Sequence, residues 1–137
     1  MHANTLGQEH RQALASAGAK VSTSPETELS MGMGRLAIAS CRAHRIAPTL
    51  SCDIVSLNSG DLFTQMRLAL AYLRQAENDP VNQSGAMPER LGWRAADALR
   101  WVAGNGAEAA TTTVVHGAGD RGLRRRQFRP ALLRASS

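Results

Sequence analysis

The stretch "TLSCDIVSLNSGDLFTQMR", residues 49–67, joins an extended segment to a helix through a polar loop. Its short apolar run stops at Asp53, and a loop containing Ser and Asn follows. After the loop, residues 62, 66, 69 and 73 are apolar and fall on one face of a helix. The stretch therefore predicts a strand, a loop that opens on an acid, and a helix.

The helix after this loop has more than one candidate cap. Asn58 or Ser59 can accept hydrogen bonds from its first N–H groups, and Asp61 suits the positive end of its dipole. Residues 79–90 contain two Pro and are predicted to form a polar connector. Residues 93–110 then predict a helix, a Gly-Asn-Gly turn and the start of another helix.

The segment before residue 49 alternates between helices and short strands. The predicted elements are a helix over 5–19, a strand over 19–25, a loop over 26–34, a helix over 35–46 and a strand over 48–52. Strands separated by helices and short loops favour an α/β fold with a parallel sheet. In such sheets, functional groups collect at the carboxyl ends of the strands, and Asp53 holds that position.

The composition is that of one globular domain with a basic tail. The chain has 137 residues, of which 43% are apolar, and a formal charge of +5. Residues 117–137 carry six Arg and one Asp, so the preceding residues are neutral overall. The high isoelectric point therefore belongs to the tail and indicates nothing about a partner of the body.

Targeting signals and metal-binding cysteine patterns are not found. No run of 18 apolar residues occurs, so no membrane is expected as a partner, and the first residues do not have the pattern of a secretory signal. The two cysteines, Cys41 and Cys52, lack metal-ligand spacing and suit a reducing compartment. A cytoplasmic location is expected.

Several segments, in one uninterrupted order, resemble a known family. The segments are "HANTLGQE" (2–9), "PETELSMGMG" (25–34), "TLSCD" (49–53), "GDLFTQMR" (60–67) and "LRWVAGNGAEA" (99–109). They resemble the C-terminal portion of the amidohydrolase superfamily, and within it the cytosine-deaminase and chlorohydrolase-like metal-dependent hydrolases. The resemblance covers roughly residues 2–109.

The resemblance implies a (β/α)₈ barrel with a divalent metal, zinc or iron, at the strand ends. It implies that Asp53 binds the metal or accepts the proton of its bound water, and that His2 is a ligand or orients the water. Glu26 and Glu28 would face the same opening and contact the substrate. The expected reaction is hydrolysis of a non-peptide C–N bond, as in deamination of a small heterocycle.

The chain also departs from the family pattern. Its four His residues form neither the His-x-His pair nor the His-x-x-Glu motif that the family places on earlier strands. Residues 1–110 are therefore expected to be a C-terminal fragment of a barrel, inactive alone and binding no metal by itself. Whether the chain is an enzyme stays open. The exposed edges of two strands predict marginal stability and self-association.

The tail over residues 111–137 does not match the family and is expected to be disordered. Its composition suggests a shifted reading frame, which translation of the other two frames would test. As an alternative, the Arg run could make the chain a small basic protein that binds nucleic acid. Because only Phe128 interrupts that run and no nucleic-acid module is present, nucleic acid is not the favoured partner. A translated gene fragment without function is the third reading.

Overall fold

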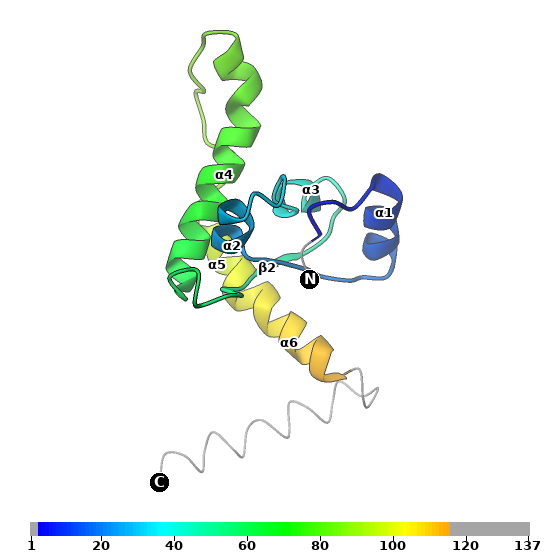
Figure 1. Cartoon of the computed structure of the whole chain (residues 1–137). Coiled ribbons are helices and arrows are strands. Elements are labelled where there is room, and N and C mark those ends of the chain that lie inside the picture. The colour runs from blue at the N-terminus through cyan, green and yellow to red at the C-terminus, as the bar shows by residue number, and fades with distance from the viewer. Residues whose placement is uncertain (1–2, 116–137) are drawn as a thin grey trace.

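A computed structural model describes residues 3–115 of the chain, with residues 111–115 described as backbone only. Helices predominate, and a two-stranded sheet lies among them (Figure 1). The elements in order are α1 (Gln8–Ser16), β1 (Val21–Thr23), α2 (Pro25–Ser30), α3 (Ile38–Cys41), β2 (Pro48–Leu50), α4 (Leu62–Gln83), α5 (Ala95–Leu99), the π-helix η1 (Arg100–Gly104) and α6 (Asn105–Val115).

The two strands pair in parallel, with Val21 opposite Pro48 and Thr23 opposite Leu50. Both predicted strands and their parallel pairing are thus confirmed. The backbone N–H of Ser51 donates to the carbonyl of Thr23 at 3.0 Å, so the two strands end side by side. Residues 3–115 contain no third strand, and the (β/α)₈ barrel stays a prediction.

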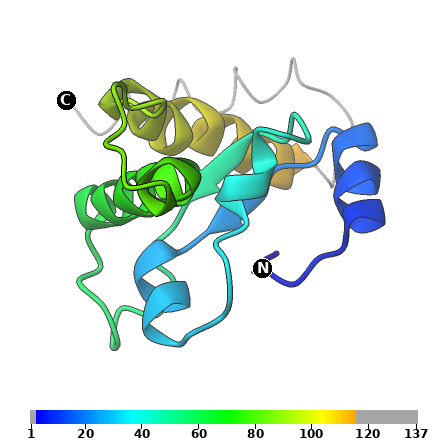
Figure 2. The same ribbon diagram turned by 90° about the horizontal axis from the view of Figure 1, so that it is seen from above.

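The outer edge of β2 is covered by the last helical segment. Seen from above, α5, η1 and α6 (yellow to orange) run alongside the strands, while α1 (dark blue) lies far from α4 (green) (Figure 2). Both η1 and α6 contact β2, and the side-chain amide of Asn105 donates to the Pro48 carbonyl at 2.7 Å. Because Pro48 has no N–H, this edge offers little to a further strand. Self-association through strand edges remains a prediction.

The core lies between α4, the sheet and the last helical segment. Met66, Ala69 and Leu73 of the predicted α4 face are buried, whereas Leu62, at the helix start, is 37% exposed. The main cluster consists of Leu36, Ile38, Leu50, Met66, Ala69, Leu70, Leu73, Ala98 and Trp101. A smaller cluster under α1 consists of Ala3, Val21, Ala37, Cys41 and Ile46. The buried apolar face of α4 thus packs against the sheet and holds the end of the loop that precedes this helix.

Two segments differ from the sequence prediction near Pro residues. The predicted loop over 26–34 is wrong in its first half, because Pro25–Ser30 form α2. The predicted connector over 79–90 is wrong at its start, because α4 continues through Pro80 to Gln83. Helix α4 instead ends where Gly85 adopts a φ of 79°, a backbone conformation that favours glycine.

The end of the described chain also differs from the prediction. The Gly-Asn-Gly sequence at 104–106 is not a turn, because α5, η1 and α6 follow one another without a break. The contact of Asn105 with β2 holds this segment in helical form despite the flanking glycines. Helix α6 crosses the predicted boundary between residues 110 and 111. The tail over 116–137, with its predicted disorder and Arg run, lies outside the described residues.

Within residues 3–115, no helix combines the length and the apolar character needed to cross a membrane.

Candidate functional site at the strand ends

The carboxyl ends of β1 and β2 open onto one cluster of polar side chains. Ser24 follows β1, Ser51 follows β2, and their hydroxyl oxygens lie 2.6 Å apart in a hydrogen bond. We use the name strand-end site for the residues around this pair, which are Glu26, Cys52, Asp53, Asn58 and Ser59. Because the two strands are parallel and in register, the residues that follow them lie at the same end of the sheet.

Asp53 lies just past β2, exposed, where the chain turns into the loop. Its φ is 56°, in the left-handed region that non-glycine residues rarely adopt. Asp and Asn tolerate this conformation better than other residues, because their short polar side chains can bond locally. Asp53 thus follows the second strand, although β2 ends at Leu50, two residues before the predicted end of the strand at Cys52. Its metal-binding or proton-accepting part stays a prediction.

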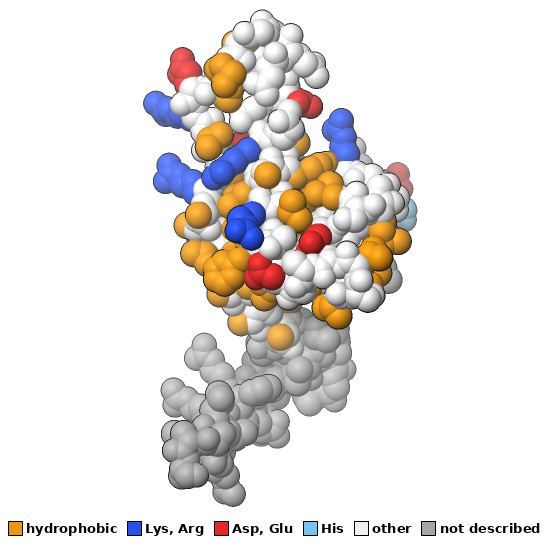
Figure 3. Space-filling view, turned by 60° about the vertical axis from the view of Figure 1, so that its left-hand side comes forward, with side chains coloured by type: hydrophobic (Ala, Val, Ile, Leu, Met, Phe, Trp, Pro, Cys, Tyr) orange, Lys and Arg blue, Asp and Glu red, His pale blue; other side chains and the backbone are white. Residues whose placement is uncertain are grey.

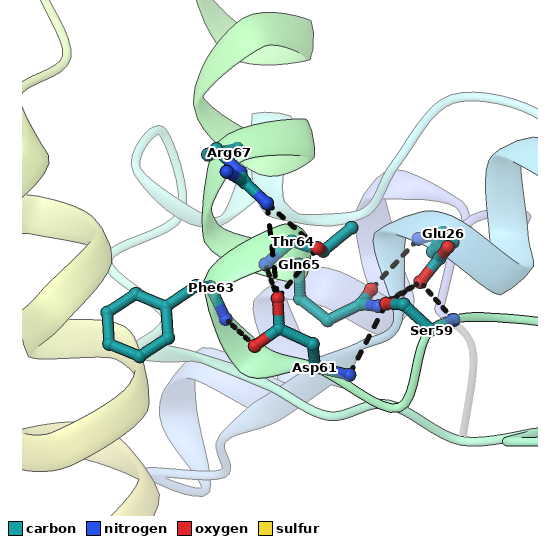
Figure 4. A network of polar contacts seen from close by, with 7 residues as sticks. All are labelled: Glu26, Ser59, Asp61, Phe63, Thr64, Gln65 and Arg67. Carbon is teal, nitrogen blue, oxygen red and sulfur yellow. Dashed lines mark hydrogen bonds and ion pairs between the residues drawn. The ribbon is translucent and has the colours of Figure 1, made fainter.

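Glu26 ties α2 to the strand-end loop and to α4 (Figure 4). Its Oε2 accepts hydrogen bonds from the backbone N–H of Ser59 at 3.1 Å, the Ser59 hydroxyl at 2.8 Å and the Gln65 amide at 2.7 Å. The backbone N–H of Glu26 donates in return to Oε1 of Gln65 at 2.9 Å. Gln65 is fully buried, so this pairing fixes the loop against the core.

Glu28, in contrast, points into the interior and is fully buried. Its Oε2 accepts from the Asn4 amide at 2.9 Å and the Thr23 hydroxyl at 2.8 Å, and its Oε1 accepts from the backbone N–H of Ser24 at 2.8 Å. The two acids expected at one opening therefore separate: Glu26 faces the loop and Glu28 faces the protein interior. Contact of either acid with substrate stays a prediction.

Asn58 holds the loop closed, although the sequence suggested only a helix cap. Its side-chain amide donates to the Thr27 hydroxyl at 2.6 Å and to the Cys52 carbonyl at 2.7 Å. These contacts connect residues that lie 31 and 6 positions away in the sequence. No local pattern indicates such a contact, since the partner Thr27 belongs to a helix that the sequence did not predict.

Asp61, and neither Asn58 nor Ser59, caps α4. Its carboxylate accepts from the backbone N–H of Phe63 at 3.0 Å and of Thr64 at 2.9 Å, and from the Thr64 hydroxyl at 2.7 Å (Figure 4). The bond from the Thr64 side chain, followed by the two backbone bonds, lowers the pKa of Asp61 below its ordinary value of 3.8. The capping carboxylate is therefore charged at neutral pH.

The Asp61 cap should make the stability of the chain depend on pH. Because the pKa of Asp61 is lowered on folding, its contribution is fully present above pH 3.8 and is lost as the pH falls through the folded pKa. We expect Asp61→Ala to lower the midpoint of thermal unfolding at pH 7, and the difference from the parent chain to shrink at about pH 2. Glu89→Ala, at an exposed site in the connector, is the control. An equal difference at both pH values would contradict the cap.

The strand-end site disfavours a thiolate at Cys52. Burial raises the pKa of the Cys52 thiol, and the carboxylates of Asp61 and Glu26 raise it further. The other cysteine, Cys41, is buried under α1, and burial raises its pKa to about 11. Since the thiolate is the reactive form, both shifts lower the fraction of reactive thiolate at neutral pH.

Alkylation rates should report this electrostatic environment. With iodoacetamide at pH 8, we expect Cys52 to react more slowly than free cysteine. Cys41 should react about a hundredfold more slowly, because its pKa of about 11 leaves little thiolate at that pH. Glu26→Gln should accelerate the reaction of Cys52 and leave Cys41 unchanged. Mass spectrometry of the two cysteine peptides separates the rates. If Cys52 reacted as fast as free cysteine, the assigned environment would be wrong.

The described residues do not form a metal site. No group of three or more His, Cys, Asp or Glu side chains within residues 3–115 could hold a metal ion. His2, the second expected ligand, lies outside the described residues. Asp53 therefore supplies at most one donor, and a zinc or iron ion would need donors from elsewhere.

Apolar side chains are exposed close to the strand-end site. Val55 and Leu57 of the loop are 69% and 56% exposed, and Phe63, in the first turn of α4, is 67% exposed. In a space-filling view, exposed apolar side chains are spread over the body of the molecule, with charged side chains between them (Figure 3). Val55, Leu57 and Phe63 are thus exposed apolar side chains on both sides of the Asp61 cap.

Comparisons with models of protein families, with curated proteins and with solved structures returned no match.

Proposed function

We propose that this chain supplies part of the strand-end rim of an amidohydrolase-type hydrolase that acts on non-peptide C–N bonds. The observation that carries the proposal is the position of Asp53, which is exposed and lies three residues past the end of β2, at the end of the sheet where β1 also stops. This is where parallel α/β folds present their catalytic groups. The resemblance of residues 2–109 to the family supplies the chemistry, and a cytoplasmic setting belongs to the proposal.

In this proposal, Asp53 handles the proton of the attacking water. Water adds to the ring carbon that carries the amino group, and the Asp53 carboxylate accepts the proton released from it. The C–N bond then breaks, and the nitrogen leaves as ammonia with the proton returned to it. The substrate is a small heterocycle with an exocyclic amino group.

The two glutamates are proposed to act differently. Oε2 of Glu26 is engaged by Ser59 and Gln65, but its Oε1 accepts no hydrogen bond from the residues described. That oxygen is available to a donor group of the substrate. Glu28 is fully buried, so we assign it a positioning part, holding the start of α2 against β1. Its effect on substrate would be indirect.

The proposal requires donors that this sequence does not contain. Neither His-x-His nor His-x-x-Glu occurs in the 137 residues, so the chain by itself is proposed to bind no metal and to be inactive. The exposed Val55, Leu57 and Phe63 flank the strand-end site and could pack against a segment that carries those motifs. The completed site would then lie between two pieces of polypeptide.

Complementation tests this proposal. The chain is produced alone and together with an N-terminal half-barrel of a cytosine-deaminase-type enzyme that contains both histidine motifs. Zinc and iron per chain are measured, with ammonia release from cytosine. We expect neither metal nor ammonia from the chain alone, and about one metal ion per complex with measurable ammonia release from the pair. Failure of the two pieces to associate, or association without metal, would contradict the proposal.

A further inference from the structure

A cavity lies at the opposite end of the sheet from the strand-end site. It has a volume of about 330 Å³ and lies where β2 begins, between α3 and the segment formed by α5 and η1. We call it the tryptophan pocket, after the lining residues used below, which are Arg42, Pro48, Trp93, Asp97, Arg100 and Trp101. Its size is at the lower end of that of small-molecule pockets.

Two indole rings supply the aromatic part of the pocket lining, beside the aliphatic Ile38 and Ile46. The rings of Trp93 and Trp101 meet edge to face, with centroids 5.6 Å apart and planes at 62°. Trp101 is only 4% exposed, and neither indole N–H donates a hydrogen bond to the residues described. A buried donor without an acceptor is costly, so a ligand with an acceptor oxygen would be favoured here.

Two guanidinium groups line the same pocket. The guanidinium carbon of Arg42 lies 4.9 Å from the centroid of the Trp93 ring, and Arg100 extends from the first turn of η1. Each guanidinium has an acidic neighbour: Arg100 Nη1 donates a hydrogen bond to Asp97 Oδ1 at 3.5 Å within the pocket lining, and Arg42 lies 3.9 Å from Glu77. Ion pairs with substantial solvent exposure contribute little, so an anion in the pocket can compete with Glu77 for Arg42 and with Asp97 for Arg100.

The backbone at the pocket is also unusual. Arg100 and Trp101 belong to η1, a π-helical turn between two α-helices. Such turns are rare and are frequently found at functional sites. The cavity and the π-turn are independent observations that point to the same two side chains.

We propose that the tryptophan pocket binds a small planar aromatic carboxylate. Its ring packs against the indole of Trp93 beside the Arg42 guanidinium, and its carboxylate pairs with Arg100. Guanidinium groups suit this ligand, because they bind carboxylates through two parallel hydrogen bonds and also stack on aromatic rings. This site lies at the other end of β2 from Asp53 and does not depend on the hydrolase proposal.

Intrinsic fluorescence reports directly on this pocket, because Trp93 and Trp101 are the only tryptophans in the sequence. The full chain is titrated with sodium benzoate, with cyclohexanecarboxylate and with benzamide. The second compound keeps the charge and loses the planar ring, and the third keeps the ring and loses the charge. We expect a saturable change with benzoate, at a dissociation constant about tenfold or more below those of both controls.

Arginine variants complete the test. We expect Arg100→Gln to weaken benzoate binding about tenfold, because a charge-assisted pair is lost. Arg67→Gln, on α4 outside the pocket, should leave binding unchanged. The Arg100 side chain is 66% exposed, so this variant should fold, which circular dichroism verifies. If Arg100→Gln does not fold, Arg42→Gln takes its place. The proposal would be overturned if the three compounds bound equally, or if benzoate gave no saturable change. It would also be overturned if the pocket variant and Arg67→Gln had the same effect on the dissociation constant for benzoate.

Discussion

Replacing Glu28 with Ala is expected to lower the free energy of unfolding of the chain by about 3–5 kcal/mol. The Glu28 carboxylate is fully buried and accepts hydrogen bonds from Asn4, Thr23 and Ser24. Ala would leave three donors without this acceptor and a cavity between β1 and α2. Removing one partner from a buried charged network costs about 3–5 kcal/mol. That is a large part of the roughly 5–15 kcal/mol that stabilises a typical domain.

Urea unfolding followed by circular dichroism measures this effect. Glu28→Gln should fall between the parent chain and Glu28→Ala, because the amide keeps the shape and one acceptor oxygen but turns an N–H₂ toward a donor. Glu89→Ala, at an exposed glutamate in the connector, is the matched control and should unfold at the parent midpoint. If Glu28→Ala unfolded at the same urea concentration as Glu89→Ala, the buried network would not contribute to stability.

Glu28 illustrates which features of the structure the sequence alone predicts and which it does not. The loop predicted over residues 26–34 rested on its two glycines, yet the residues before them carry a helix signal. Ser24 is the N-cap, Pro25 takes the first helical position and the acids Glu26 and Glu28 lie in the first turn. This signal is local and was available in the sequence. The burial of Glu28 was not, because it depends on Asn4 and Thr23, which come from other elements.

Local periodicity explains the parts of the fold that were predicted. The strands, their parallel pairing and the buried side of α4 follow from patterns within about 20 residues of sequence. The continuation of α4 through Pro80 was not predicted, because Pro usually ends a helix. Here Pro80 lies in the last turn of α4, so the hydrogen bond that it removes is close to the end of the helix. Tertiary contacts, such as that of Asn105 with β2, override the glycine signal at 104–106.

The candidate site likewise contains one feature that was predicted from local sequence and others that depend on distant residues. The position of Asp53 follows from the end of an apolar run, which is visible in sequence. The contacts of Glu26 with Ser59 and Gln65 span 33 and 39 positions and are set only when α2, the loop and α4 come together. The tryptophan pocket is a further case, since Arg42 and Trp93 come from segments 51 positions apart. The place of an acid after a strand can therefore be predicted from the sequence, while the side chains that pack around it cannot.

In the complemented assembly, Asp53→Asn is expected to reduce ammonia release from cytosine about a hundredfold or more. An amide cannot accept the proton of the attacking water, so the loss should appear in kcat. Asn adopts a positive φ about as readily as Asp, and the backbone at residue 53 should keep its φ of 56°. The urea midpoint of the Asp53→Asn chain should therefore change little. Loss of activity without loss of stability is the expected signature of a proton acceptor.

Two further substitutions at this position separate the carboxylate from the backbone. Asp53→Gly removes the side chain and accepts the left-handed conformation, so it should match Asp53→Asn in activity and remain folded. Asp53→Val places a β-branched residue at a positive φ and should lower stability by about 1–2 kcal/mol. Since the carboxylate alone is proposed to carry the chemistry, all three variants should be inactive regardless of stability. Release of ammonia by Asp53→Asn within about twofold of the parent rate would remove Asp53 from the reaction, because general-base contributions are typically about a hundredfold or more.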